Sequence, residues 1–143
     1  MTTSRATAVW EKGLKDGSGD YRAASGSFAG RYSFETRFVG APGSTPEELI
    51  AAAHASCLSM ALSADLEKAG TPATRVETEA ACSIEMVGGV PTITTMALQV
   101  RGQVQGLDQA AFRKAAEAAK ENCPVSRALK ESVQFTLDAT LEP

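Results

Sequence analysis

The sequence predicts an α+β fold with the element order β-β-β-α-β-β-α-β, mainly antiparallel sheets and a long buried central helix. Three observations predict it. The first third alternates between polar and apolar residues and is broken by turn clusters, the segment Leu49–Leu62 is a continuous apolar run, and two long alternating stretches flank Gly88-Gly89. A length of 143 residues suits one core. We therefore expect a single domain over residues 1–143.

Short strands occupy the first third of the chain. The turn clusters Asp16-Gly17-Ser18-Gly19 and Ser25-Gly26 separate them. The strands predicted from this pattern are Ala6–Glu11, Asp20–Ala24 and Gly30–Val39. In the third strand, period-two alternation puts Arg37 on the face opposite Phe38.

The central helix has clear start and stop signals. Thr45 can cap it, Pro46 suits its first position, and Glu48 completes a capping box. The helix should run to about Ala69, with Gly70 as its stop. Because its middle is apolar nearly all round, we expect that part to be buried on most sides.

The second half begins with a hairpin that turns at Gly88-Gly89. Asp108 then caps a helix, Pro124 ends it, and the alternation of apolar residues from Val133 to Leu141 predicts a last strand. The elements expected here are strands Thr74–Met86 and Val90–Val104, helix Gln109–Asn122, a short helical turn Val125–Lys130, and the strand at the C-terminus.

Composition argues against several partners. The net charge is -3 and the pI is about 5.2, with no stretch rich in Lys or Arg, so nucleic acid and anionic membrane are poor candidates. The N-terminus lacks the apolar core of a secretory signal. The most apolar segment, Leu49–Leu62, is shorter than the roughly 20 residues of a membrane span and includes His54. We expect no membrane partner and a cytoplasmic location.

Three cysteines and one histidine limit the metal chemistry. An odd number of cysteines argues against a fully paired disulfide framework, and Cys57, Cys82 and Cys123 form no CxxC pair. A structural zinc site is hard to assemble from this set, so we expect no metal. In a reducing compartment such thiols are buried small residues, metal ligands or redox groups.

Each cysteine has a structural and a chemical interpretation. Cys57, in the apolar helix, is either a small buried residue or a nucleophile. If Pro124 begins a new helical turn, Cys123 is its N-cap, and the backbone N–H groups there favour a thiolate. Otherwise Cys123 only marks a helix end. Cys82 lies in the apolar phase of a strand and is interpreted as a core residue.

An Arg and a Glu could support a reactive thiol. Arg37 is either a solvated strand residue or a guanidinium that lowers a thiol pKa and holds a peroxide oxygen. Glu47 either complements the helix dipole or orients Arg37. Glu47 and Cys57 are ten residues apart, about 15 Å along one helix. A site containing both needs a second, antiparallel copy of the helix, which predicts a homodimer with shared sites.

His54 lies three residues before Cys57, on the same helical face. The two could form a Cys–His nucleophile pair or supply two metal ligands. No third group that completes either arrangement is evident. A histidine buried for packing or for a structural hydrogen bond is the favoured interpretation.

Three blocks of sequence resemble the signature motifs of the OsmC/Ohr family, in the same order and spacing. They are Thr36-Arg37-Phe38, the segment from Thr45-Pro46-Glu47 to Ser56-Cys57, and Asn122-Cys123-Pro124-Val125-Ser126. The sequence has His54 rather than an aromatic residue upstream of Cys57, and in this it resembles the OsmC branch more than the Ohr branch. The resemblance implies an intertwined homodimer with two sites at its interface.

The resemblance also implies a chemistry. Cys57 would be the attacking thiol, Cys123 the resolving thiol, and Arg37 and Glu47 a supporting ion pair. The expected activity is reduction of organic hydroperoxides, in preference to hydrogen peroxide, in defence against oxidative or osmotic stress. Dihydrolipoyl groups or small thiols would be the reductant, with no cofactor. The alternative is a non-enzymatic thiol redox sensor or a small-ligand binding protein.

Overall fold

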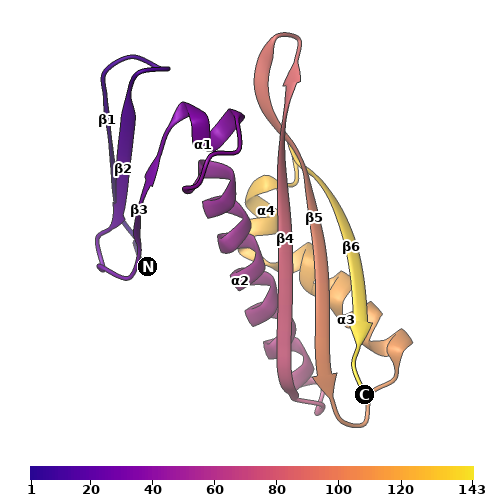
Figure 1. Cartoon of the computed structure of the whole chain (residues 1–143). Coiled ribbons are helices and arrows are strands. Elements are labelled where there is room, and N and C mark those ends of the chain that lie inside the picture. Colours follow the sequence, from indigo (N-terminus) through magenta and orange to yellow (C-terminus); the bar gives the residue numbers. More distant parts are fainter. The chain divides into compact units, whose positions relative to one another are not determined.

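The computed structural model describes residues 1–143, which form two compact units, residues 1–49 and residues 50–143. Figure 1 labels the elements along the chain. Their bounds are β1 Ala6–Glu11, β2 Ser18–Ala23, β3 Ala29–Tyr32, α1 Phe34–Phe38, α2 Pro46–Lys68, β4 Ala73–Val87, β5 Val90–Val104, α3 Gln109–Asn122, α4 Pro124–Leu129 and β6 Gln134–Leu141. The predicted order of strands and long helices is confirmed.

The first unit contains a three-stranded antiparallel sheet in the order β1-β2-β3. Ala23 is the only buried apolar side chain among residues 1–49, and Val9 and Phe28 are about half exposed. Three short strands stabilise a fold only when one face of the sheet is covered. This sheet therefore needs a surface other than its own side chains to pack against.

The predicted strand Gly30–Val39 is wrong beyond Tyr32. Ser33 caps the short helix α1: its Oγ accepts the Thr36 backbone N–H at 3.1 Å, and Thr36 Oγ1 accepts the Ser33 N–H at 2.9 Å. This reciprocal pair satisfies two N–H groups locally, which favours a helical turn over the strand that the alternation suggested. Arg37 consequently lies on a helix and not on a strand.

Helix α2 begins and ends where the sequence predicts. Thr45 Oγ1 accepts the Glu48 backbone N–H at 3.0 Å, and Pro46 is the first helical residue. At the other end Gly70 has a φ of +84°, and the Thr71 N–H donates to the Leu66 carbonyl at 2.9 Å. This Schellman arrangement needs a left-handed residue, which glycine supplies without strain.

The second unit contains the sheet β4-β5-β6. Strands β4 and β5 are antiparallel around Gly88 and Gly89, both of which have positive φ, as a tight hairpin requires. Strand β6 pairs with β5 in parallel, from Thr95 opposite Gln134 to Gly102 opposite Leu141. Helices α3 and α4 form the crossover that a parallel pair needs. The sheets are mainly antiparallel, as predicted, but no local pattern in the sequence indicated this parallel pair.

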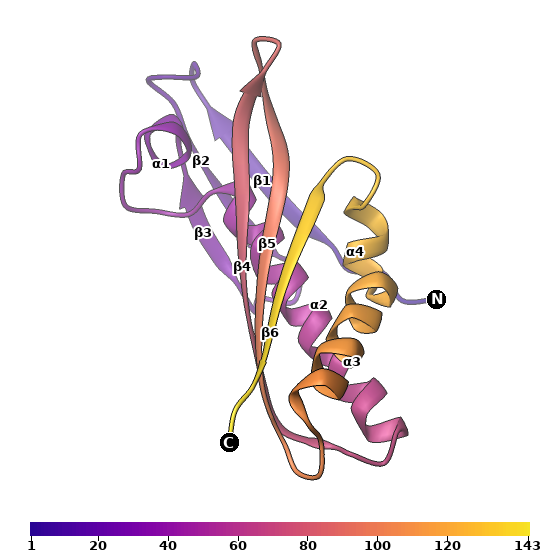
Figure 2. The same cartoon turned by 90° about the vertical axis from the view of Figure 1, so that its right-hand side faces the viewer.

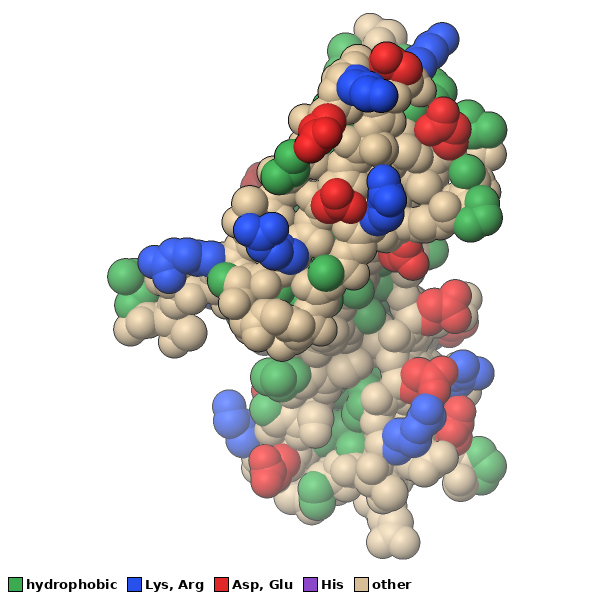
Figure 3. Space-filling model, turned by 60° about the vertical axis from the view of Figure 1, so that its left-hand side comes forward, with side chains coloured by type: hydrophobic (Ala, Val, Ile, Leu, Met, Phe, Trp, Pro, Cys, Tyr) green, Lys and Arg blue, Asp and Glu red, His purple; other side chains and the backbone are tan.

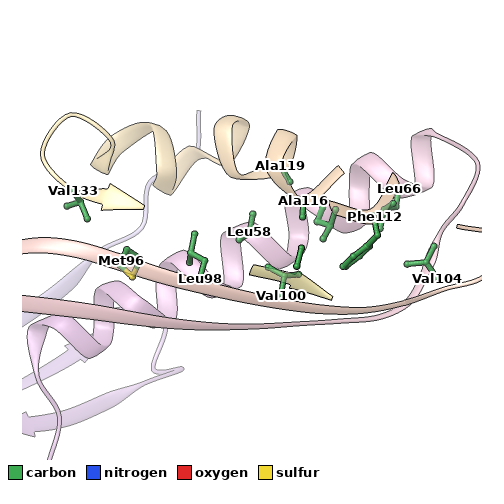
Figure 4. Close-up of a cluster of buried hydrophobic side chains, with 12 residues drawn as sticks. Leu58, Leu66, Met96, Leu98, Val100, Val104, Phe112, Ala116, Ala119 and Val133 are labelled. Atoms are coloured by element: carbon green, nitrogen blue, oxygen red, sulfur yellow. The ribbon is translucent and has the colours of Figure 1, made fainter. Parts of the chain in front are cut away.

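The core of the second unit lies between the sheet and helices α2 and α3, which cover one face of it (Figures 1 and 2). The close-up in Figure 4 shows side chains from both helices and from β5 pointing into this layer. Fully buried members include Leu58, Leu62, Met96, Phe112 and Ala116. This layer fixes α2 and α3 against the sheet, and so holds the ends of both helices in place.

Within one chain, α2 is buried along one stripe only. Its buried residues in the second unit, His54, Leu58, Leu62 and Leu66, recur every four positions. On the opposite side Met60 keeps 76% of its surface exposed. The predicted burial on most sides is therefore not met by a single chain.

Helix α2 is longer than the apolar segment Leu49–Leu62 on which the expectation of no membrane span was based. The whole helix has 23 residues, and by length and composition it could cross a membrane, with 22% of its most apolar window buried. Core helices of water-soluble proteins meet the same criteria, so this is weak evidence for a span. The helix also carries the buried polar side chains of Glu47 and His54.

Phe112 gives a direct test of the core. Its ring is fully buried, so Phe112→Ala should lower the free energy of unfolding by about 3–5 kcal/mol, because burial is lost and a cavity remains. The measurement is denaturant unfolding followed by circular dichroism. The neighbouring exposed Arg113→Ala is the matched control, and equal stability of the two variants would contradict this description of the core.

Candidate active site

In the first unit, helix α1 and the first turn of α2 bring Arg37 to Glu47. Arg37 Nε donates to Glu47 Oε1 at 2.9 Å, and Nη2 donates to the same oxygen at 2.5 Å. The Glu47 side chain is 7% exposed and that of Arg37 is 35% exposed. The predicted ion pair is present, and both residues come from one chain.

One atom of this pair has no partner. Glu47 Oε2 is buried and accepts no hydrogen bond. A buried carboxylate oxygen normally has a donor, because its desolvation otherwise goes uncompensated. Glu47 is therefore oriented by Arg37 and still has capacity to accept a further donor.

In the second unit, α2 and the junction between α3 and α4 bring two thiols together. Cys57, on α2, is partly exposed, whereas Cys123 is completely buried. Both are free thiols, and Cys57 is hydrogen bonded to Cys123. The family resemblance implied that these two cysteines work together, and the structure brings them into contact.

Cys123 is the N-cap of α4, as the Cys-Pro sequence predicted. Its backbone N–H still donates to the Ala119 carbonyl of α3, and Pro124 occupies the first position of α4. The Ser126 backbone N–H donates to Cys123 Sγ at 3.4 Å. A sulfur at a helix N-terminus is in the place where a negative charge is favoured.

The two thiols have different proton affinities within the single chain. Burial raises the pKa of Cys57, and its hydrogen bond to Cys123 raises it further, against a smaller lowering by the Val125 backbone. Burial also raises the pKa of Cys123, but hydrogen bonds from Cys57 and Ser126 outweigh that effect and lower it overall. Of the two thiols in the single chain, Cys123 is therefore the one that loses its proton more readily.

The hydrogen-bond partner of His54 is Ser126. Its Nε2 lies 2.7 Å from Ser126 Oγ, and its ring meets the Phe135 ring edge-on at a centroid distance of 4.9 Å. Nδ1 is buried without a partner. Burial lowers the pKa of His54, which favours the neutral ring. The structural hydrogen bond favoured by the sequence is present.

Cys82 and the metal site considered from the sequence are the remaining candidates. Cys82 packs on the edge of the hydrophobic core from strand β4, opposite Met96. No group of three or more His, Cys, Asp or Glu side chains is arranged to hold a metal ion. The sequence pattern did not predict a role for Ser126, although it stands three residues after Cys123, the position from which a backbone N–H donates to the N-cap residue.

The chain matches a family model and a relative over most of its length. A model described as OsmC-like protein matches residues 39–138. The chain belongs to the OsmC-like family. A relative named peroxiredoxin OsmC, from Escherichia coli (strain K12), is 42% identical over 139 residues, which cover 96% of each chain. The predicted family is confirmed.

Solved structures support the same fold. An organic hydroperoxide resistance protein from Elizabethkingia anophelis matches with a TM-score of 0.79 and 20% identity, covering 99% of this chain and 98% of that chain. The organic hydroperoxide resistance protein OhrB of Bacillus subtilis matches with a TM-score of 0.75 and 23% identity, covering 96% and 98%. At these identities the likeness establishes the OsmC/Ohr fold.

The buried His54 should make folding stability depend on pH. Its pKa is lowered in the folded chain, so the unfolded chain binds the proton more readily, and stability should fall as the pH drops through about 6.5. His54→Gln, which cannot titrate, should lose that part of the pH dependence. Denaturant unfolding at a series of pH values tests this, and parallel profiles for the two proteins would refute it.

Proposed function

We propose that this protein is a thiol-dependent peroxidase that reduces organic hydroperoxides to alcohols. The observation that carries the proposal is the contact between a partly exposed Cys57 and a fully buried Cys123 at a helix N-terminus. A peroxide can reach the first sulfur, and the second is already placed to condense with it. The names of the Escherichia coli and Elizabethkingia relatives agree with this chemistry.

The cycle has three steps. The Cys57 thiolate attacks the distal peroxide oxygen, the O–O bond breaks, and the alkoxide takes a proton and leaves as the alcohol. The Cys123 thiolate then attacks the sulfur of the Cys57 sulfenic acid, whose oxygen leaves as water after gaining a proton. An external dithiol reduces the resulting disulfide and is itself oxidised. No metal or organic cofactor takes part in these steps.

Cys57 needs a neighbouring group that lowers its pKa before it can attack as a thiolate. In the single chain its pKa is raised by burial and by its hydrogen bond to Cys123. A guanidinium beside Cys57 would reverse this, since an adjacent positive charge favours the thiolate. Arg37, oriented by Glu47, is the group we assign to this role.

The source of that guanidinium is a second subunit. Glu47 and Cys57 lie on the same helix, about 15 Å apart along its axis. Because Arg37 is bonded to Glu47 in its own chain, both would come from the partner. We infer that the site is completed in a homodimer whose chains each form one domain over residues 1–143.

Exposed apolar surface in both units supports the dimer. The sheet β1-β2-β3 has no core of its own, and α2 leaves Met60 exposed. The tip of the β4–β5 hairpin also exposes Met86, Val87 and Val90. Such surfaces are typical of a chain that is intertwined with a partner.

The remaining partners are small molecules. We assign an organic hydroperoxide as substrate and a dihydrolipoyl group or small thiol as reductant, acting in the cytoplasm. Figure 3 shows acidic and basic side chains interspersed on the face in view, with no large patch of one sign. That surface and a net charge of -3 disfavour binding to nucleic acid or to anionic membrane.

Two cysteine variants test the mechanism. With tert-butyl hydroperoxide and a dithiol reductant, the wild type should complete many turnovers and Cys57→Ser none, because the attacking sulfur is gone. Cys123→Ser should be oxidised once, after which Cys57 proceeds to sulfinic acid, visible by mass spectrometry. Normal turnover by Cys57→Ser would refute the mechanism. A single oxidation of the wild type without turnover would favour a redox sensor.

Mixed subunits test the shared site. Glu47→Ala and Cys57→Ser subunits, each inactive alone, should together recover about one quarter of wild-type activity, since half of randomly formed dimers carry one intact site. Glu47→Ala mixed with Arg37→Ala is the matched control. It should recover nothing, because the structure pairs these two residues within one chain. Equal recovery in the two mixtures, or in neither, would contradict the shared site.

A further inference from the structure

The buried polar groups of His54 and Ser126 lie next to Cys123 and take no part in the mechanism proposed above. His54 Nε2 is 2.7 Å from Ser126 Oγ, and the Ser126 backbone N–H is 3.4 Å from Cys123 Sγ. A hydrogen bond from the Ser126 hydroxyl also lowers the pKa of Cys123. At most 1% of the surface of each of these three residues is exposed. Water therefore does not compete with these hydrogen bonds, which makes them stronger.

The direction of these hydrogen bonds follows from the unpartnered atom of His54. Nδ1 is buried and has no partner. A buried N–H without an acceptor is more costly than an acceptor with unused capacity, so the proton of the neutral ring belongs on Nε2. Nε2–H then donates to Ser126 Oγ, and the serine O–H is left to donate to Cys123 Sγ.

We propose that His54 and Ser126 are positioning residues that make the Cys57–Cys123 disulfide easy to reduce, by stabilising Cys123 as the thiolate that leaves. This rests on the disulfide of the proposed function. The thiolate of the reductant attacks Cys57 Sγ and forms a mixed disulfide there. The S–S bond breaks, and its electron pair goes to Cys123 Sγ. The second reductant thiol then releases Cys57 as a thiolate and is oxidised to a disulfide.

Ser126 offers two hydrogen-bond donors to Cys123 Sγ when it leaves as a thiolate. They are the backbone N–H and the hydroxyl, which is oriented by His54. A leaving thiol with a lower pKa departs faster, and a stabilised reduced form makes a disulfide more oxidising. Attack on Cys57 is also the accessible direction, because Cys57 is partly exposed and Cys123 is buried. Geometry and electrostatics thus select the same sulfur for attack.

The groups that lower the pKa of Cys123 are hydrogen-bond donors without a formal charge. A cavity of about 240 Å³ borders Ser126 and Phe135, and its charged lining residues are Lys120, Glu121 and Lys130. Lys120 is paired with Glu117 at 2.9 Å and lies 3.8 Å from Glu121, so its charge is largely balanced. The donors that touch Cys123 Sγ are the thiol of Cys57 and the groups of Ser126 and Val125.

The test measures the disulfide equilibrium without any peroxide. In a Cys82→Ala background, the disulfide is formed with diamide and equilibrated with glutathione, and oxidised and reduced protein are counted by mass spectrometry. Ser126→Ala, which loses the hydroxyl but keeps the backbone N–H, should shift the equilibrium about tenfold toward the disulfide. His54→Leu should do the same. His54→Gln, which retains an Nε2 donor, should restore most of the wild-type value.

Ser59→Ala is the matched control, because Ser59 on the same helix donates a 2.7 Å hydrogen bond to Thr78. It should leave the equilibrium unchanged. An unchanged equilibrium in Ser126→Ala, or failure of the wild type to form the disulfide, would overturn the proposal. If the His54→Leu variant does not fold, the equilibrium measured for Ser126→Ala decides whether the proposal stands. If the variants shift the equilibrium but the wild type shows no peroxide turnover, this inference stands and the proposed peroxidase activity is refuted.

Discussion

The break between α3 and α4 at Cys123-Pro124 is the constraint on which the site depends. Proline has no N–H and disfavours a helical residue before it, so α3 ends and a new helix begins at once. The free N–H groups of the new first turn then point at Cys123 Sγ. Packing of α3 against the core holds this junction next to α2, where Cys57 lies. A position that favours a thiolate thus follows from a local interruption of a helix.

Helix α2 joins structural and chemical roles in one element. Its buried stripe packs against the sheet and carries His54, while Cys57 lies at the edge of that stripe and remains partly exposed. Its first turn carries Glu47, which holds Arg37. Helical rise separates Glu47 from Cys57 along α2, so the shared site that we propose would need a second subunit.

Local signals in the sequence were sufficient for most of the fold. Strand β5, helix α3 and the start of α2 follow from alternation, capping residues and proline, all of which act within a few residues. The helix α1 was missed because alternation and capping compete there, and Ser33 decides in favour of the helix. The parallel β5–β6 pair and the contact between His54 and Ser126, 72 residues apart, depend on tertiary packing, which no local pattern reports.

In the proposed cycle, the capping role of Cys123 would link the redox state of the protein to the order of helix α4. A disulfide sulfur is a weaker acceptor than a thiolate, so oxidation removes much of what holds the Ser126 amide at the first turn of α4. The amide should then exchange its hydrogen with solvent more readily in the oxidised protein. The order of helix α4, which is only six residues long, should therefore differ between the reduced and the oxidised protein.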